Sequence, residues 1–130
     1  MTPLLVLNVV GLTRALLAKF PGQARCIEAL AKDGASATLG TLLPAVTTSA
    51  QATFLTGLPP REHGIVANGW YFRELAEVHF WKQSNHLMGG EKVWDAGHAR
   101  DPKFTSAQIG WWYNMYSSND VAVTMRPYEG

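Results

Sequence analysis

Residues 44–68 read PAVTTSAQATFLTGLPPREHGIVAN, and this stretch decides how the centre of the chain folds. Pro44 disfavours helix in the residue before it. Apolar residues then recur at helical spacing until Gly57, which is a common C-terminal stop. Three hydroxyl residues of the type that caps helices stand at the start of this pattern: Thr47, Thr48 and Ser49. The pattern therefore predicts a short apolar helix that begins at one of these hydroxyl groups.

The entrance of this helix is predicted to attract an anion. The first backbone N–H groups of a helix have no acceptor within it, and the helix dipole is positive at that end, so phosphate is favoured there. A threonine hydroxyl is a weak nucleophile at neutral pH, and a base or a metal must activate it. No histidine stands near Thr47 in the sequence, so a metal is the simpler activator, although a base could approach through the fold.

The segment after Gly57 is predicted to turn back toward the helix entrance. A break at residues 57–60 and a His63-Gly64 turn would present Asn68 to the place where the helix begins. His63 is expected to fix this loop by side-chain hydrogen bonds. Two non-functional interpretations stay open. The hydroxyl cluster is also typical of a plain N-cap, and Asn68-Gly69 is also typical of an ordinary tight turn.

The order of these motifs resembles the N-terminal part of the type I phosphodiesterase/nucleotide pyrophosphatase family, within the alkaline phosphatase superfamily. The motifs are an apolar first strand, P-x-x-T at 44–47, T-G-L-x-P at 56–60, H-G-I at 63–65, and Asn68. In that family the threonine after P-x-x is the nucleophile and bridges two metal ions, usually zinc. The resemblance implies this catalytic and metal-binding role for Thr47, and it implies substrate contacts from Asn68 and from a backbone N–H near Thr48.

The resemblance also implies an activity and a domain. The full-length parent is expected to hydrolyse phosphodiester or pyrophosphate bonds of a small-molecule phosphate ester, through a phosphothreonine intermediate and with two divalent metal ions. Residues 1–130 are expected to be the N-terminal part of one alkaline phosphatase-like catalytic domain, truncated and inactive alone, because the family's other metal ligands come from later segments.

One departure from the family pattern concerns the metal site. Family members end the first strand with an aspartate ligand before a glycine, whereas Val10 stands before Gly11 here. Asn8 is two residues earlier and would lie on the same face of a strand, with an amide oxygen as a weaker ligand. Together with the resemblance, this gives Thr47 and Asn8 as the expected metal ligands. The sequence also permits a residue from elsewhere in place of Asn8, or a site that binds metal poorly. The alternative is a non-catalytic relative that binds phosphoryl ligands and has lost the first metal aspartate.

The predicted fold is α/β, with a mostly parallel sheet flanked by helices, alkaline phosphatase-like and incomplete. Residues 4–10 form a continuous apolar run, as expected for a parallel strand covered on both faces. A helix is predicted after Pro21, at 24–33, and a second strand at 35–43. Because ligands bind beyond the carboxyl ends of strands in open α/β sheets, the Gly11 region and Thr47 would share the functional edge.

The second half of the chain is richer in aromatic residues. Residues 69–73 and 78–81 are β-prone and predict either a hairpin or an extended excursion over the site. Residues 92–100 predict a helix. Two further strands are expected at 107–116 and 121–124, separated by a turn-prone Ser-Ser-Asn-Asp link.

Composition limits the classes of partner. The net charge is +1 and charged residues make up 16% of the chain, with no basic block, so no nucleic-acid partner is expected. The 4–10 run is far shorter than the ~20 residues of a membrane span, and a cytoplasmic location without a membrane partner is expected. Five tryptophans, four tyrosines and five phenylalanines predict exposed aromatic surface and possible self-association.

Overall fold

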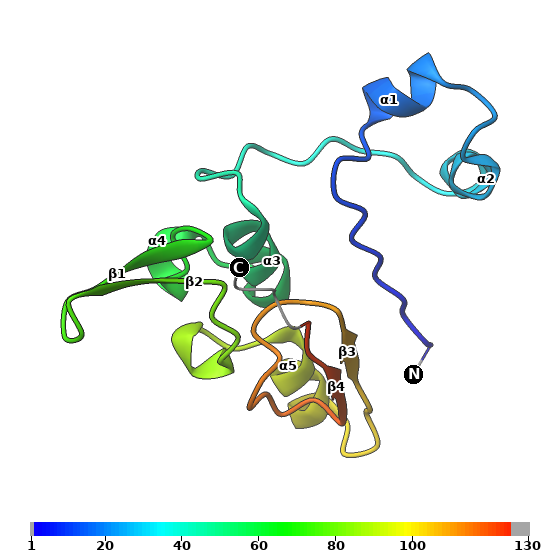
Figure 1. Ribbon diagram of the computed structural model, residues 1–130. Helices are drawn as coiled ribbons and strands as arrows, with labels where there is room; N and C mark the ends of the chain where they lie inside the picture. Colours follow the sequence, from blue (N-terminus) through cyan, green and yellow to red (C-terminus); the bar gives the residue numbers. More distant parts are fainter. Residues whose placement is uncertain (1, 126–130) are drawn as a thin grey trace. The chain divides into compact units, whose positions relative to one another are not determined.

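The computed structural model describes residues 2–125, and the chain divides into two compact units, Met1–Gly40 and Thr41–Gly130. Figure 1 shows the elements in chain order. We call these unit 1 and unit 2. No helix within residues 2–125 has the length and apolar character needed to cross a membrane.

Unit 1 contains two short helices, α1 (Arg14–Lys19) and α2 (Arg25–Asp33), neither of which buries a residue. The Thr13 hydroxyl caps α1 by accepting a hydrogen bond from the Leu16 N–H at 3.1 Å. The apolar spacing predicted α2 correctly, whereas α1 was not predicted. Both helices thus form from local signals, without a buried core in this unit.

The two strands predicted in and beside unit 1 are not found. Residues 2–9 and 35–42 contain no helix or strand, and the side chains of Leu4 and Leu39 are 85% and 74% exposed. A parallel strand needs hydrogen-bonded neighbours and cover on both faces, and none of the described strands pairs with either segment. The prediction of an α/β chain is confirmed at that coarse level, but the mostly parallel sheet is absent from residues 2–125.

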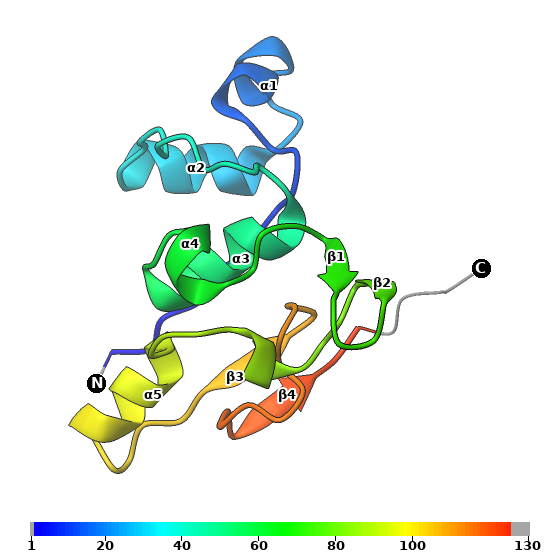
Figure 2. The ribbon, with the colours of Figure 1, turned by 90° about the vertical axis from the view of Figure 1, so that its left-hand side faces the viewer.

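Unit 2 begins with the predicted central helix, α3 (Thr47–Thr56), which ends at Gly57 with φ +70°. The N-cap residue is Val46, and no side chain caps the helix, so the prediction that a hydroxyl residue is the N-cap was wrong. The short helix α4 (Pro60–His63) follows and ends at Gly64, also left-handed at φ +81°. Figures 1 and 2 both show α4 beside α3.

The strands of unit 2 form two small sheets. Strands β1 (Gly69–Phe72) and β2 (Glu77–Phe80) form the predicted antiparallel hairpin. Strands β3 (Ala107–Ile109) and β4 (Val121–Val123) pair in parallel. The strand predicted at 107–116 ends after three residues, because Gly110 has φ +66° and leaves the extended region.

Two helical elements lie between the two sheets in chain order. A 3₁₀ turn, η1 (Asn85–Leu87), leads to α5 (Val93–Arg100), which confirms the helix predicted at 92–100.

The core of unit 2 joins α3, α5 and the aromatic segment at 111–116. Its buried apolar residues are Ala52, Leu55, Ile65, Met88, Trp94, Trp112 and Tyr113. Buried amides bind this segment to its neighbours: Gln51 Oε1 accepts from the Trp112 N–H at 2.9 Å, and Asn114 Nδ2 donates to the Val123 carbonyl at 2.8 Å. The aromatic residues are therefore held by specific hydrogen bonds as well as by apolar contact.

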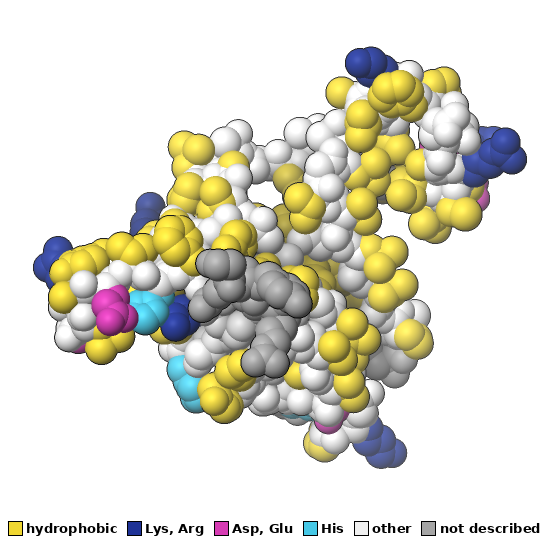
Figure 3. Space-filling model, viewed as in Figure 1, with side chains coloured by type: hydrophobic (Ala, Val, Ile, Leu, Met, Phe, Trp, Pro, Cys, Tyr) yellow, Lys and Arg dark blue, Asp and Glu magenta, His cyan; other side chains and the backbone are white. Residues whose placement is uncertain are grey.

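Apolar side chains also remain on the surface. Figure 3 shows hydrophobic side chains spread over the visible face. On the hairpin, Tyr71, Val78 and Phe80 are 56%, 58% and 57% exposed. Self-association through this surface stays a prediction, which light scattering at increasing protein concentration tests.

Candidate functional site

The three hydroxyl residues at the entrance of α3 differ in burial, a difference that the sequence alone did not show. The first intrahelical hydrogen bond runs from the Ala50 N–H to the Val46 carbonyl at 3.0 Å, so the three preceding N–H groups lie outside the helical ladder. Thr48 and Ser49 are fully buried, whereas Thr47 is partly exposed. Thr47 is therefore the one of the three that solvent reaches.

Asn68 lies against the first turn of α3. Its Oδ1 accepts a hydrogen bond from the Thr48 N–H at 3.2 Å and lies 3.1 Å from the Thr48 hydroxyl. The same hydroxyl lies 2.7 Å from the Ala67 carbonyl oxygen. The structure thus brings together Thr47, Thr48 and Asn68, which the sequence had assigned to one site.

These hydrogen bonds fix the orientation of the Asn68 amide. A backbone N–H must meet an acceptor, so the Asn68 atom that faces Thr48 is the oxygen, and the NH₂ group is at the opposite end. Asn68 can therefore offer donors to an anion while its oxygen completes the first turn of α3. The Thr48 N–H is engaged by Asn68, so a substrate contact from this group would require that hydrogen bond to open, and the role of Thr48 stays a prediction.

His63 fixes the loop between α3 and Asn68, as expected. It is fully buried, and its Nδ1 accepts from the Ile65 N–H at 3.0 Å. Nε2 therefore carries the proton and donates to the Thr53 hydroxyl at 3.0 Å. Burial lowers the pKa of His63, and a backbone hydrogen bond opposes this shift. Both ring nitrogens are used within the protein, so His63 acts here as a structural residue.

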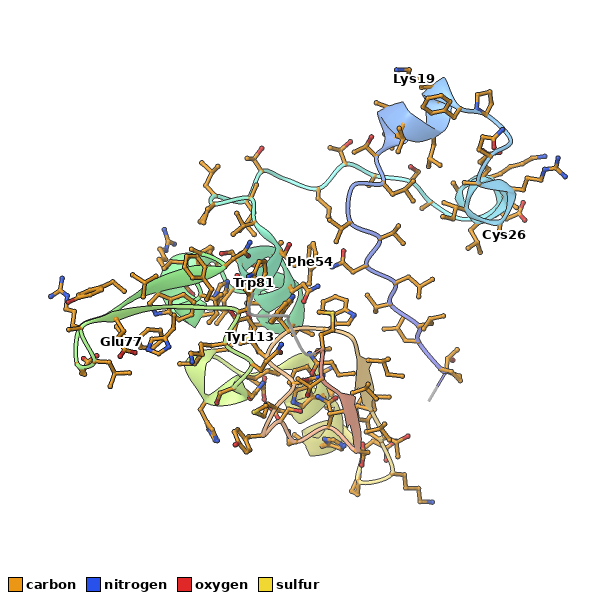
Figure 4. All side chains as sticks on the ribbon, in the orientation of Figure 1. Lys19, Cys26, Phe54, Glu77, Trp81 and Tyr113 are labelled. Atoms are coloured by element: carbon orange, nitrogen blue, oxygen red, sulfur yellow. The ribbon has the colours of Figure 1, made fainter. Side chains whose placement is uncertain are left out.

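Tyr113 is a site neighbour that the sequence did not predict. The residue is 1% exposed and belongs to the core cluster that includes Ala52 and Leu55 of α3. Figure 4 labels it among the side chains of unit 2. Burial raises the pKa of Tyr113 to about 12, while the hydrogen bond to Thr48 acts in the opposite direction. In the sequence this residue is one of several aromatics in a run, and no local signal shows which ring turns inward.

The two metal ligands expected from the sequence, Asn8 and Thr47, belong to different units. Asn8 is an exposed residue of unit 1, and Thr47 belongs to unit 2. Within residues 2–125, no group of three or more His, Cys, Asp or Glu side chains lies close enough to hold a metal ion. A hydroxyl and a neutral amide are too few ligands for two zinc ions, which take about four each. Metal binding by Thr47 and Asn8 therefore stays a prediction.

A groove of about 710 Å³ is lined by residues of the hairpin and of the segment that follows it. Its wall is mainly apolar and includes Phe72, Leu75, Trp81, Leu87 and Met115, with Lys82 among the polar residues. Neither Thr47 nor Asn68 lines it, so this volume is not part of the candidate site.

The entrance of a helix favours anions such as phosphate, and here it carries a solvent-reachable hydroxyl and an adjacent amide. In agreement with this, residues 4–129 match the family described as type I phosphodiesterase / nucleotide pyrophosphatase. The match covers nearly the whole chain, so the protein belongs to this family. Comparisons with curated proteins and with solved structures gave no match. Membership implies an alkaline phosphatase-like fold, and it points to a hydrolase that acts on phosphodiester or pyrophosphate bonds.

Proposed function

We propose that the full-length protein hydrolyses phosphodiester or pyrophosphate bonds through a phosphothreonine intermediate at Thr47. One observation carries this proposal: the Asn68 amide is hydrogen-bonded to the first turn of α3, directly after the solvent-reachable Thr47. Family membership supports the reaction class. A small-molecule phosphate ester is the proposed substrate.

The chain's own residues would act as follows. The non-bridging phosphate oxygens would face the positive end of α3 and the NH₂ group of Asn68. Thr47 Oγ1 would attack phosphorus and lose its proton, while the bond from phosphorus to the leaving-group oxygen breaks and that oxygen is protonated. Water would then attack phosphorus in the phosphothreonine, breaking the bond to Thr47 Oγ1, releasing the phosphate monoester and restoring the hydroxyl. Donors from Asn68 and the helix would stabilise the charge that builds on the phosphate oxygens in both steps.

Two divalent metal ions, with zinc as the first choice, remain part of the proposal, and their chemistry is to lower the pKa of the Thr47 hydroxyl. Thr47 and Asn8 are the ligands that we propose from this chain. We also propose that residues 1–130 form the N-terminal part of one alkaline phosphatase-like domain with a mostly parallel sheet. A cytoplasmic location likewise stays a prediction.

The direct test is turnover of bis-p-nitrophenyl phosphate by the full-length protein and its T47A variant. Turnover should be lost in T47A and kept in T41A, which removes the hydroxyl of an exposed threonine ahead of the helix. Retained turnover in T47A would remove Thr47 from the mechanism.

A second candidate function is a non-catalytic protein that binds phosphoryl ligands at the same helix entrance. Val10, at the place of the family's first metal aspartate, favours this alternative. Metal analysis of the purified full-length protein separates the two functions. Near-stoichiometric zinc or manganese supports hydrolysis, whereas a folded, metal-free protein that binds inorganic phosphate supports the binding function.

A further inference from the structure

Trp81 joins the end of the hairpin to the backbone of Asn68. It is the first residue after β2, and its N–H donates to the Asn68 carbonyl at 2.8 Å, directly beyond the Gly69–Phe80 pair of the ladder. Its φ is +54°, in the left-handed region that a bulky side chain rarely adopts. Such conformations persist only where the surrounding structure enforces them, and they gather at functional sites. The contacts of Trp81 should therefore show what fixes Asn68.

Ala76 provides an internal comparison. Its φ is also +54°, but it is an exposed residue of the turn between β1 and β2, where a left-handed backbone is ordinary. Trp81 lies at the opposite end of the hairpin, and its side chain is half-buried and packed against the core. The strain at Trp81 is therefore compensated by side-chain packing and is not required by a turn.

The ring of Trp81 packs on Trp112, which other elements hold firmly. The two ring centroids are 4.9 Å apart, with an angle of 31° between the planes. Trp112 is 6% exposed, and Gln51 Oε1 on α3 accepts from its N–H at 2.9 Å. Its carbonyl accepts from Gln108 Nε2 at 3.0 Å, and the next residue, Tyr113, is left-handed with φ +62°. Trp112 thus presents a fixed surface to Trp81.

These contacts form a closed circuit that begins and ends on α3. The Thr48 N–H donates to Asn68 Oδ1 at 3.2 Å, and the Asn68 carbonyl accepts from Trp81. Trp81 packs on Trp112, whose N–H returns to Gln51, three residues after Thr48. Asn68 is therefore held at two points, its side-chain oxygen and its backbone carbonyl. One point would leave the amide free to pivot, whereas two points fix the direction of its NH₂ group.

The bond between Trp81 and Asn68 needs an anchor of this kind. An isolated two-stranded hairpin is marginally stable, and β1 and β2 pair over only four residues each. A terminal hydrogen bond of such a hairpin opens first. Trp70 also packs against the core, but its ring stacks on Phe72 of the same strand at 5.4 Å. Trp81 is therefore the anchor at the end of the hairpin that follows Asn68.

We propose that Trp81 and Trp112 are positioning residues, which fix the Asn68 backbone relative to α3 so that its NH₂ group points to the substrate. Their effect on turnover rests on the function proposed above, whereas their hold on the Asn68 carbonyl does not. Both act through Asn68 and do not touch the substrate. Loss of the ring contact should open the hydrogen bond between Trp81 and Asn68 and misalign the Asn68 donors.

The first test is hydrogen exchange of the Trp81 amide in the full-length protein, compared between W112L and the matched variant W94L. Trp94 is a tryptophan of α5 in the same core, 3% exposed. The amide of the fully buried Ile65, which donates to His63 Nδ1 at 3.0 Å, reports opening of the whole core. Relative to Ile65, we expect Trp81 exchange to be about tenfold faster in W112L and as in wild type in W94L.

A wild-type ratio of the two exchange rates in W112L would overturn the proposal, and so would the same change in W94L at equal loss of stability. The variant W112F keeps a ring against Trp81, so it should accelerate Trp81 exchange less than W112L does. If W112L does not fold, W112F decides the test with W94F as its control. Trp81 exchange at least about twofold faster than in wild type, relative to Ile65, supports the proposal, and a wild-type ratio overturns it.

The second measurement is steady-state hydrolysis of bis-p-nitrophenyl phosphate. Misaligned donors should lower kcat in W112L by about tenfold, with a smaller change in KM, because the donors act on charge in the transition state. W112F should recover part of this loss, and W94L should keep the wild-type kcat. Faster Trp81 exchange with a wild-type kcat in W112L would contradict the positioning role.

The two measurements separate this proposal from the function on which it rests. If T47A keeps its activity while W112L opens the Trp81 amide, the nucleophile assignment fails and the hold of Trp112 on the Asn68 segment stands. If T47A is inactive but Trp81 exchange in W112L is unchanged, the proposed function stands and the positioning role of the two tryptophans fails.

Discussion

Units 1 and 2 show the difference between apolar sequence and a buried core. Unit 1 has a continuous apolar run and two helices, yet Leu5 and Val10 are 79% and 74% exposed and neither helix buries a residue. Unit 2 buries seven apolar residues and connects them with side-chain amides. The difference teaches that an apolar run becomes a strand only when other strands are there to pair with it, whereas a helix with caps and internal hydrogen bonds needs less support.

The same difference divides the candidate site. Thr47 and Asn68, the residues proposed to bind the phosphoryl group, lie within unit 2, while Asn8, the other proposed metal ligand, lies in unit 1. Variants in the two units should therefore have effects of different size on binding, activity and stability.

The largest effect is expected from T47A. Loss of a nucleophile should reduce turnover of a phosphodiester by at least about 10³-fold. The matched variant in unit 1 is N8A, for which we expect a smaller loss that added zinc reverses, because an amide is a weak ligand. Initial rates with and without zinc measure both. Equal losses in the two variants would show that unit 1 contributes as much to the site as the helix entrance does.

A somewhat smaller effect is expected from N68A. Removal of its NH₂ donors should lower kcat by about 10²–10³-fold, as found when one oxyanion donor is deleted. The variant also removes an acceptor from the first turn of α3, which should cost about 1 kcal/mol of unfolding free energy. The control is N119A, whose amide donates to Gln108 Oε1 away from the helix entrance. Unchanged kcat in N68A would mean that the amide does not contact the transition state.

The contrast in burial predicts a large loss of unfolding free energy for one leucine variant and almost none for another. Leu55 is 8% exposed in the core of unit 2, so L55A should lower the unfolding free energy by about 2–5 kcal/mol. Leu5 is 79% exposed, so in the 130-residue chain L5A should change the unfolding free energy by no more than about 0.5 kcal/mol. Urea denaturation of both variants measures the difference. A large loss in L5A would show that residues 4–10 are buried in solution, as a paired strand would be.

The sequence predicted α3 and α2 well because their signals are local. Pro44, the apolar spacing and Gly57 act within the helix or beside it. The prediction of the N-cap residue was wrong because the Thr48 hydroxyl forms hydrogen bonds with Ala67 and Asn68, some twenty residues later, and is not available to cap the helix. The position of the hydroxyl residues at the helix entrance was thus predictable from the sequence, but the hydrogen-bond partner of each hydroxyl was not.

Tyr113 shows the same limit more strongly. Its left-handed backbone depends on amides at positions 51, 85 and 108, which no local pattern connects. The aromatic-rich run around it is equally typical of a strand, which is why a strand was expected there. A backbone conformation that long-range contacts impose can be identified only after the fold has brought the contacting residues together.

The smallest expected effect is the pH dependence of stability that arises from His63 in unit 2. Because burial lowers the pKa of His63 in the folded state, the unfolded chain binds the proton more tightly. The stabilising contribution is therefore complete above the ordinary histidine pKa of about 6.5 and is lost as the pH falls through the folded-state pKa. Unfolding free energies from urea titrations between about pH 8 and pH 5.5 should decline over this range, where carboxylates stay ionised.

The variant H63N keeps an acceptor for the Ile65 N–H and carries no titrating proton, so the decline should become shallower. The exposed histidine of η1 supplies the control, and H86N should keep the wild-type slope. A wild-type slope in H63N would mean that His63 is not the buried, neutral link between α4 and α3. Because that link fixes the loop leading to Asn68, H63N should also weaken phosphate binding in proportion to its loss of stability.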